Sequence, residues 1–197
     1  MSKRKIQSIC YLAFTPLLLF GCDFMENIFP DKDNDGVIIA NLNEIPFEAE
    51  GGKGFLAKEF LKAELEESED YYLLTVYGIR VQDDKKALAL GFQLAGNDIS
   101  EITAGSTYSN WILLDEKAGK FEGAKGAVEM RNSVKSDNSV FKASSFYTGE
   151  IKLTITEIDL SKREFSGSFQ FSALDSQVDT LFQVTEGNFE NVKWKAL

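Results

Sequence analysis

A short acidic run near the N-terminus has the residue types and the spacing of a calcium-binding loop. Asp31, Asp33 and Asp35 are separated by single residues, and a glycine follows the third aspartate. A D-x-D-x-D-G turn directs three carboxylates toward one point, and calcium takes six to eight oxygen ligands. The twelfth position of an EF-hand loop supplies a bidentate glutamate, whereas that position is Leu42 here. We therefore expect a loose calcium site at most, and a solvated acidic linker is the alternative interpretation.

Paired carboxylates are a second kind of chemistry that the chain could carry. Retaining and inverting glycosidases need only two acids at a defined separation. No spacing in the sequence singles out a pair, and the side chains considered are Glu48, Glu50, Glu150, Glu157 and Asp175. In an antiparallel sheet, most residues of this type form the solvated face. A carboxylate-dependent enzyme that acts on glycans is therefore an alternative to a non-enzymatic protein.

Aromatic side chains offer a surface on which a sugar ring or a peptide could stack. The candidates for such a ligand-binding surface are Tyr71, Tyr72, Tyr108 and Trp111. If Tyr71 and Tyr72 lie in one strand, they point to opposite faces, so one of them should be outside or at a rim. Core packing is the competing interpretation for most of the aromatic residues.

The composition excludes the commonest catalytic and metal-binding arrangements. The chain has no histidine, which excludes Ser-His-Asp and Cys-His nucleophile activation, and zinc or haem sites with histidine ligands. Its two cysteines are Cys10 and Cys22. If the chain is cut before Cys22, one cysteine remains and no intramolecular disulfide can form. Calcium is the only cofactor that we consider.

The first 22 residues resemble the signal peptide and lipobox of bacterial lipoproteins. Lys3, Arg4 and Lys5 precede an apolar run over residues 6–20, and Leu19-Phe20-Gly21-Cys22 closes it. The resemblance implies cleavage before Cys22, diacylation of its thiol, and acylation of the new amine by a fatty acid such as palmitate. Several acyl chains hold a protein on a membrane permanently, whereas one chain holds it only marginally.

Two other interpretations of this apolar run are weaker. It is shorter than the roughly 20 residues that a spanning helix needs, and Pro16 interrupts it. An ordinary secretory signal would end in an A-x-A-like cleavage site, which is missing. We expect the outer membrane as the location. Asp23 and Glu26 follow Cys22. These acidic residues leave open whether the lipid anchor lies in the periplasmic or in the surface leaflet.

Removal of residues 1–21 takes away three positive charges, so the formal net charge of −10 becomes more negative still. Nucleic acid is therefore not expected as a partner, because phosphates require basic patches. Anionic headgroups would repel the chain, so the lipid must provide the membrane attachment. We expect an acidic tether over residues 22–45 and one globular, β-rich domain over residues 46–197.

The domain is expected to be all-β, because short stretches of alternating apolar residues are bounded by Gly, Asn, Asp and Ser. We expect an antiparallel β-sandwich of about eight or nine strands, with a closed up-and-down barrel as the alternative. The clearest strands lie at 149–160, where the alternation slips near Glu157, and at 165–171. Hairpin loops are expected at 159–163 and 82–86.

Residues 55–67 are ambiguous between strand and helix. They are rich in Ala, Leu, Lys and Glu, which are good helix formers. A lone helix between strands would need its own packing surface. We therefore favour a strand for Phe55–Glu67.

Several short motifs follow one another in a particular order between Phe47 and Trp194. In chain order they are Phe47-Glu48-Ala49, Phe55-Leu56-Ala57, Thr148-Gly149-Glu150-Ile151, Thr154-Ile155-Thr156, Ser166-Gly167-Ser168-Phe169-Gln170-Phe171 and Thr185-Glu186-Gly187-Asn188-Phe189. With the lipobox upstream, this order resembles an uncharacterised lipoprotein family common in Bacteroidota. The resemblance implies a compact β-sandwich or barrel on a lipid anchor. It implies no established activity, and it supplies no functional residues to transfer to this chain.

These observations together predict a lipid-anchored protein of the cell envelope. We expect a non-enzymatic module that binds or scaffolds a protein or glycan partner. A glycan-active enzyme is one alternative. A lipocalin-like carrier of an apolar molecule is another, and it depends on closure of a barrel.

Overall fold

The computed structural model describes residues 34–52, 59–115, 120–136 and 138–197. The lipobox with Cys22, and two of the three candidate calcium ligands, Asp31 and Asp33, lie outside these residues. Within the described ranges, no helix has the length and apolar character needed to cross a membrane. Apart from one short 3₁₀ turn, the regular structure there consists of β-strands.

The elements follow one another along the chain as short and long strands joined mostly by tight turns. In order they are β1 (Val37–Leu42), β2 (Ile45–Glu50), β3 (Glu59–Ser68), β4 (Tyr71–Val81), β5 (Ala87–Gly96), the 3₁₀ turn η1 (Ile99–Glu101), β6 (Thr107–Tyr108), β7 (Trp111–Asp115), β8 (Lys120–Arg131), β9 (Ser139–Ser144), β10 (Ile151–Asp159), β11 (Glu164–Asp175), β12 (Thr180–Lys193) and β13 (Lys195–Ala196).

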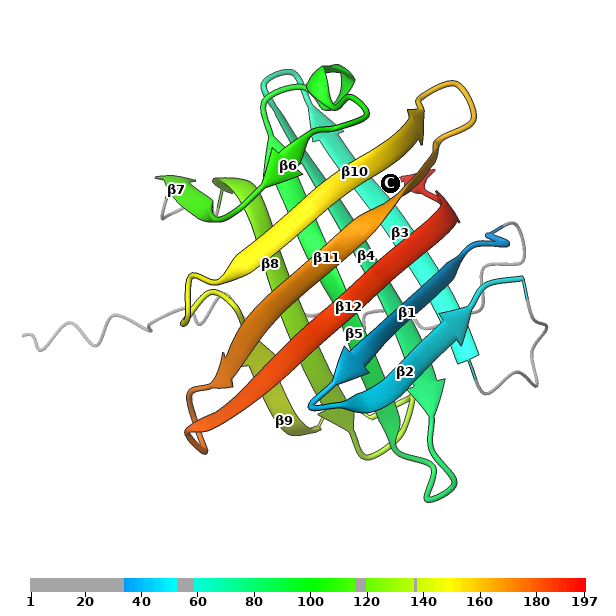
Figure 1. Cartoon of the computed structure of the whole chain (residues 1–197), viewed down its shortest axis with the longest axis vertical. Helices are drawn as coiled ribbons and strands as arrows, with labels where there is room; N and C mark the ends of the chain where they lie inside the picture. Colours follow the sequence, from blue (N-terminus) through cyan, green and yellow to red (C-terminus); the bar gives the residue numbers. More distant parts are fainter. Residues whose placement is uncertain (1–33, 53–58, 116–119, 137) are drawn as a thin grey trace, which may run out of the picture.

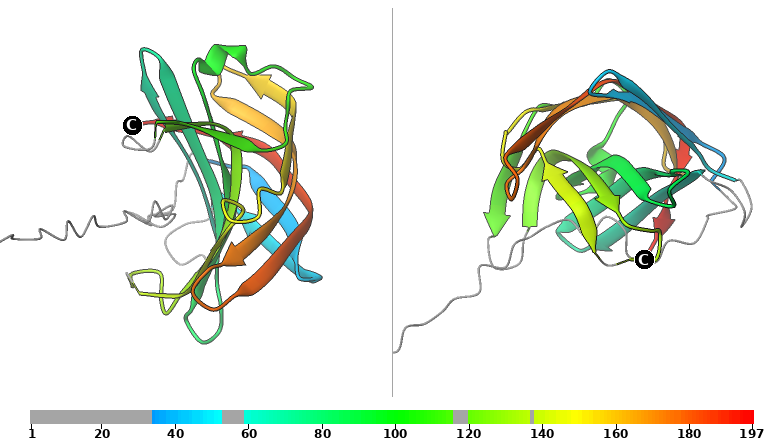
Figure 2. Two further views of the ribbon diagram at one scale, coloured as in Figure 1. Left: turned by 90° about the vertical axis from the view of Figure 1, so that its left-hand side faces the viewer. Right: turned by 90° about the horizontal axis from the view of Figure 1, so that it is seen from below.

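All of these strands belong to one strongly curled sheet. Its main path runs β13-β3-β4-β5-β8-β9-β11-β12-β1-β2, and β6, β7 and β10 pair beside it. Figure 1 shows β10, β11, β12, β1 and β2 crossing in front of β3, β4, β5 and β8. Strand β9 joins the two layers, because it pairs with β8 on one side and with β11 on the other. Figure 2 shows the concave space that the two layers enclose.

The prediction of an all-β fold is confirmed. The two layers expected of a sandwich are present, but they are parts of one continuous sheet that folds back at β9. Among the described residues the path starts at β13 and ends at β2 without returning, so the sheet is open and not the closed barrel of the alternative. The described strands outnumber the eight or nine expected. Strands as short as β6 and β13 are too brief to show an alternation in the sequence.

The boundary expected between tether and domain is corrected by the position of β1. This strand begins at Val37, inside the range 22–45 assigned to the tether, and lies between β2 and β12 in the sheet. Ile38 and Ala40 point into the core from it. The polar, turn-rich residues 31–36 directly before Val37 are typical of a linker, and the alternating stretch that follows them is short.

Several local predictions are confirmed. The ambiguous segment is a strand over its described part, because Glu59–Ser68 pairs along its whole length with β4. Residues 55–58 lie outside the described residues. Hairpin turns join β4 to β5 after Val81 and β10 to β11 after Asp159. The slip of alternation near Glu157 is an irregularity in the β10–β11 register.

Phenylalanines fill the space between the layers. Phe92 of β5 lies 5.5 Å from Phe169 and 5.0 Å from Phe189, measured between ring centroids. Glycines make room for two of the rings: a Cβ at position 126 would lie 2.4 Å from the ring of Phe171, and one at 167 would lie 2.6 Å from the ring of Phe189. Close packing of these rings therefore fills the middle of the concave space.

The outer face of β8 carries a buried ion pair. Glu129 and Arg131 point to the same side of the strand, and the Arg131 Nε donates to the Glu129 Oε1 over 2.8 Å. The Ser139 hydroxyl of β9 donates to the same oxygen. The other carboxylate oxygen, Oε2, has no hydrogen-bond partner among the described residues. The side chains of both ionised residues are more than nine-tenths buried.

Candidate functional site

The inward face of strand β4 connects the two ends of the concave space. Its pairing with β3 and with β5 is continuous, so alternate residues from Tyr72 to Arg80 face inward. Eight residues of extended chain separate Tyr72 from Arg80, which is about 26 Å. In Figure 1, β4 runs from the upper end of the sheet, beside η1, down to the β4–β5 hairpin. Tyr72, near the start of β4, therefore belongs to the upper end, and Arg80, near its end, to the lower one.

A polar cleft of about 290 Å³ opens at the upper end. It lies between the beginning of β4, the end of β5, the turn η1, strand β6 and the beginning of β8 (Figure 1). Its lining combines two tyrosines with amide, hydroxyl and carboxylate groups: Tyr72, Asn97, Asp98, Glu101, Tyr108, Ser109, Asn110 and Glu122. The cleft can therefore both donate and accept hydrogen bonds over a small surface.

Tyr72 and Tyr108 form the centre of this cleft. The Tyr72 ring packs over Gly96, where an added Cβ would lie 2.9 Å from the ring. Burial raises the pKa of Tyr72 well above the usual value for tyrosine, and interaction with Tyr108 raises it further. Burial also raises the pKa of Tyr108, against the effect of hydrogen bonds with Ser106 and Tyr72. Both hydroxyls therefore stay protonated at neutral pH.

The Tyr108 hydroxyl is the polar group at the middle of this arrangement. It forms hydrogen bonds with Tyr72 and Ser106. A tyrosine hydroxyl can both donate and accept, so these two neighbours do not exhaust its hydrogen-bonding capacity. Tyr108 is half-buried and lines the cleft, so a ligand there can contact it.

Carboxylates surround the tyrosine pair. The Asp98 Oδ1 caps η1 by accepting from the Ser100 backbone N–H over 2.8 Å. Hydrogen bonds from Ser100 lower the pKa of Asp98, so its charge is fixed near the cleft. Glu101 of η1 and Glu122 of β8 are exposed and also line the cleft. The cleft is therefore acidic, and it disfavours anionic ligands.

Two of the four predicted aromatic residues lie outside this cleft. As expected for neighbours in one strand, Tyr72 is buried whereas Tyr71 is partly exposed. The Tyr71 hydroxyl accepts from the Phe121 N–H, and the Lys120 ammonium lies 5.1 Å from the Tyr71 ring centroid. Trp111 stacks on Phe146, with ring centroids 4.6 Å apart. The structure thus brings Tyr72 and Tyr108 together and separates Tyr71 and Trp111 from them.

The five carboxylates considered from the sequence do not converge. Glu48, Glu150 and Glu157 line three different grooves on the described surface. Asp175 is buried in a structural role, because its carboxylate accepts from the backbone N–H groups of Lys142 and Gln177. Glu50 ends strand β2. The pair of acids that could act together, Glu101 and Glu122, is a different one.

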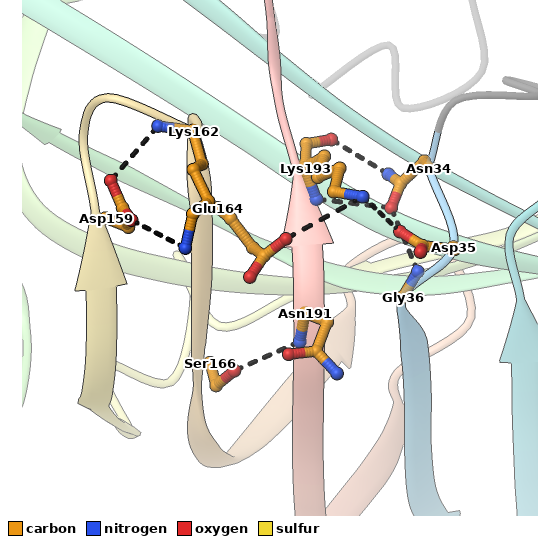
Figure 3. A network of polar contacts seen from close by, with 9 residues as sticks. All are labelled: Asn34, Asp35, Gly36, Asp159, Lys162, Glu164, Ser166, Asn191 and Lys193. Carbon is orange, nitrogen blue, oxygen red and sulfur yellow. Dashed lines mark hydrogen bonds and ion pairs between the residues drawn. The ribbon is translucent and has the colours of Figure 1, made fainter.

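Asp35, the described member of the candidate calcium loop, makes an ion pair. The Lys193 ammonium donates to its Oδ1 over 2.6 Å and lies 3.7 Å from the Glu164 carboxylate (Figure 3). This hydrogen bond lowers the pKa of Asp35. The buried Asn34 amide donates to the Lys193 carbonyl, which fixes the start of β1 to the end of β12. In the described ranges, no group of three or more acidic, cysteine or histidine side chains is placed to hold a metal ion.

The residues of the cleft that the sequence did not single out come from turns and from the start of β8. Asn97, Asp98, Asn110 and Glu122 lie outside or at the ends of alternating stretches, so no periodicity marked them. One local signal was available: Asp98 two residues before Ser100 is the pattern of a helix-capping residue. That pattern identifies the turn, but not the cleft on which the turn borders.

Comparison with known proteins gives no match: no family model, no curated protein and no solved structure is similar to this chain.

Proposed function

We propose that this protein is a lipid-anchored binding module of the cell envelope that takes a neutral or amino sugar in the Tyr72–Tyr108 cleft. The observation that carries the proposal is the paired tyrosine hydroxyls, set among amide and carboxylate side chains in one open cleft. Sugar recognition requires this mixture of donors, acceptors and aromatic edges. The anchor part of the proposal rests on the lipobox that ends at Cys22.

The charge of the cleft supports this class of ligand. Asp98, Glu101 and Glu122 line it, and no lysine or arginine does so among the described residues. Coulomb repulsion disfavours phosphates, sulfates and uronic acids, whereas hydroxyl groups and ammonium groups donate well to carboxylates. The openness of the cleft to solvent fits the end or the side of a glycan chain.

Truncation of Tyr108 tests the site. We expect Tyr108→Ala to weaken binding about tenfold or more, because it removes a hydrogen bond and an aromatic contact. Tyr108→Phe should have a smaller effect, because the ring remains. The full-length chain in a detergent without sugar groups would be screened against immobilised neutral, amino and acidic glycans, and affinities measured for the hits.

Tyr147→Ala is the matched control, because Tyr147 is an exposed tyrosine outside the cleft. It should leave the affinity unchanged. A glycan that binds equally to wild type and to Tyr108→Ala would place the binding site elsewhere. Binding to none of the neutral or amino glycans would reject a sugar as the ligand.

A hydrolytic function is the second candidate, because Glu101 and Glu122 border the same cleft. Two carboxylates on either side of a sugar are the requirement for glycoside hydrolysis. The same glycans would be analysed for cleavage products. If a glycan is cleaved by the wild type but not by Glu101→Gln or Glu122→Gln, the protein is an enzyme and not a binding module. If a glycan binds and no cleavage product forms, the result supports the binding module.

The anchor has its own test. We expect Cys22→Ser to move the protein from the membrane fraction to the soluble fraction, because it removes the lipobox thiol that would carry the lipid. Membrane attachment that survives this substitution would contradict lipidation. A protease added to intact cells would then distinguish the leaflets: rapid cleavage, with a periplasmic control intact, indicates the cell surface.

A further inference from the structure

The opposite end of the curled sheet holds a second pocket, of about 200 Å³, with a mainly apolar lining. It lies at the lower end in Figure 1, where the β1–β2 turn approaches the β4–β5 hairpin. Both layers contribute apolar side chains to it: Leu42, Phe47, Leu88, Met130, Phe141 and Phe182. Since the phenylalanine core fills the space between the two ends, this pocket is separate from the tyrosine cleft.

Core packing holds the walls of this pocket in place. Phe141 of β9 and Phe182 of β12 stack with ring centroids 4.5 Å apart and form one wall. Phe47 and Leu88, which lie deeper, are almost fully buried. Gly78 opposite leaves space for the Phe47 ring, because a Cβ there would lie 3.2 Å from that ring. The pocket therefore exists before a ligand enters, as is usual for small-molecule sites.

Arg80 is the one charged side chain among the described residues that line this pocket. Its Nη1 donates to the Pro46 carbonyl over 2.9 Å, and its guanidinium carbon lies 5.5 Å from the Phe47 ring centroid. A guanidinium has five donors, so this one bond leaves capacity for a carboxylate. An apolar wall that ends at a cation is complementary to an anionic amphiphile.

Carboxylates on the other side of Arg80 sharpen this selectivity. Glu48, Glu59 and Glu186 line the neighbouring groove, which Arg80 also borders. They repel a simple anion that approaches from solvent. An anion whose apolar tail occupies the pocket gains the free energy of burying that tail, about 0.8 kcal/mol for each methylene group. The site should therefore bind a carboxylate with a tail and not a small inorganic anion.

We propose that this pocket binds a single-chain carboxylate, with its apolar tail between Phe47, Leu88 and Phe182 and its head group on Arg80. The volume of about 200 Å³ limits the tail to a short or medium chain. A longer chain would leave its remainder in solvent. This site does not depend on the sugar site, so either proposal can fail alone.

Photocrosslinking of the full-length chain in nanodiscs tests the proposal, with octanoic acid carrying a diazirine near the tail end as the probe. We expect crosslinks in the peptides that contain Phe141 and Phe182. Unlabelled octanoate should compete, whereas acetate and octylamine should not. Met130→Trp, which fills the pocket, should reduce crosslinking at least tenfold, and Arg80→Gln should reduce affinity about tenfold.

Leu160→Trp is the matched control, because it places the same ring on an exposed apolar residue of the β10–β11 turn that lines neither this pocket nor the tyrosine cleft. It should leave crosslinking unchanged. Thermal unfolding of each variant shows whether it is folded. The competition experiment uses only the wild-type chain, so it tests the proposal even if a variant does not fold. Crosslinks that are spread over the surface, or equal competition by octylamine and octanoate, would overturn the proposal.

Discussion

Phe189→Ala is expected to lower the free energy of unfolding by about 3–5 kcal/mol, the range for removal of a fully buried phenylalanine. Phe189 joins the two layers: its ring centroid lies 5.0 Å from that of Phe92 in β5 and 5.0 Å from that of Phe165 in β11. Its ring also covers Gly167, which has no side chain to fill the cavity. Urea unfolding followed by tryptophan fluorescence measures the change.

Phe146→Ala is the matched control for this substitution. Phe146 is 41% exposed and packs mainly against Trp111 and Tyr147 at the surface. Its loss should cost no more than about 1.5 kcal/mol, the upper value for one aromatic pair. Equal effects of the two substitutions would mean that the layers are not held together by the phenylalanine core.

Arg131→Met is expected to destabilise the fold by about 3–5 kcal/mol, because it leaves the buried Glu129 carboxylate without its counter-charge. Glu129 Oε2 already lacks a hydrogen-bond partner among the described residues, and the Ser139 hydroxyl donates only to the other oxygen, Oε1. Urea unfolding at pH 7 measures the change.

Two further variants separate charge burial from loss of packing. Glu129→Leu combined with Arg131→Met removes both charges, and it should recover most of the lost stability, because apolar replacement of a buried pair is often neutral. Lys162→Met removes one partner of an exposed pair with Asp159. It should leave the free energy of unfolding almost unchanged, because an exposed ion pair is screened by solvent. A double variant as unstable as Arg131→Met would contradict the electrostatic explanation.

The local structure of the domain followed from patterns in the sequence. Alternation of apolar residues identified β10 and β11, and the slip at Glu157 indicated the irregularity between them. Turn residues located the hairpin after Asp159, whose carboxylate accepts from the N–H groups of Ser161 and Lys162. These features depend on residues that are close in the chain, so the sequence alone contains their cause.

The start of the domain and the assembly of its layers depended on distant partners. Val37–Leu42 is a strand because β12, far along the chain, offers it a hydrogen-bonding edge. The lone β9 strand turns two layers into one sheet by pairing with β8 and β11. No local pattern reveals such pairings, because the alternation of apolar residues within a strand does not depend on which strand pairs with it.

The all-β class, the exclusion of histidine chemistry and the resemblance to a lipobox follow from the amino-acid sequence. The sequence also indicates Tyr72 and Tyr108 as candidate ligand-binding residues. The fold is needed to show that these two meet in one cleft, that Tyr71 and Trp111 lie elsewhere, and that Arg80 lies beside an apolar pocket. A site is a convergence of side chains from several strands, and the curl of the sheet sets where they converge.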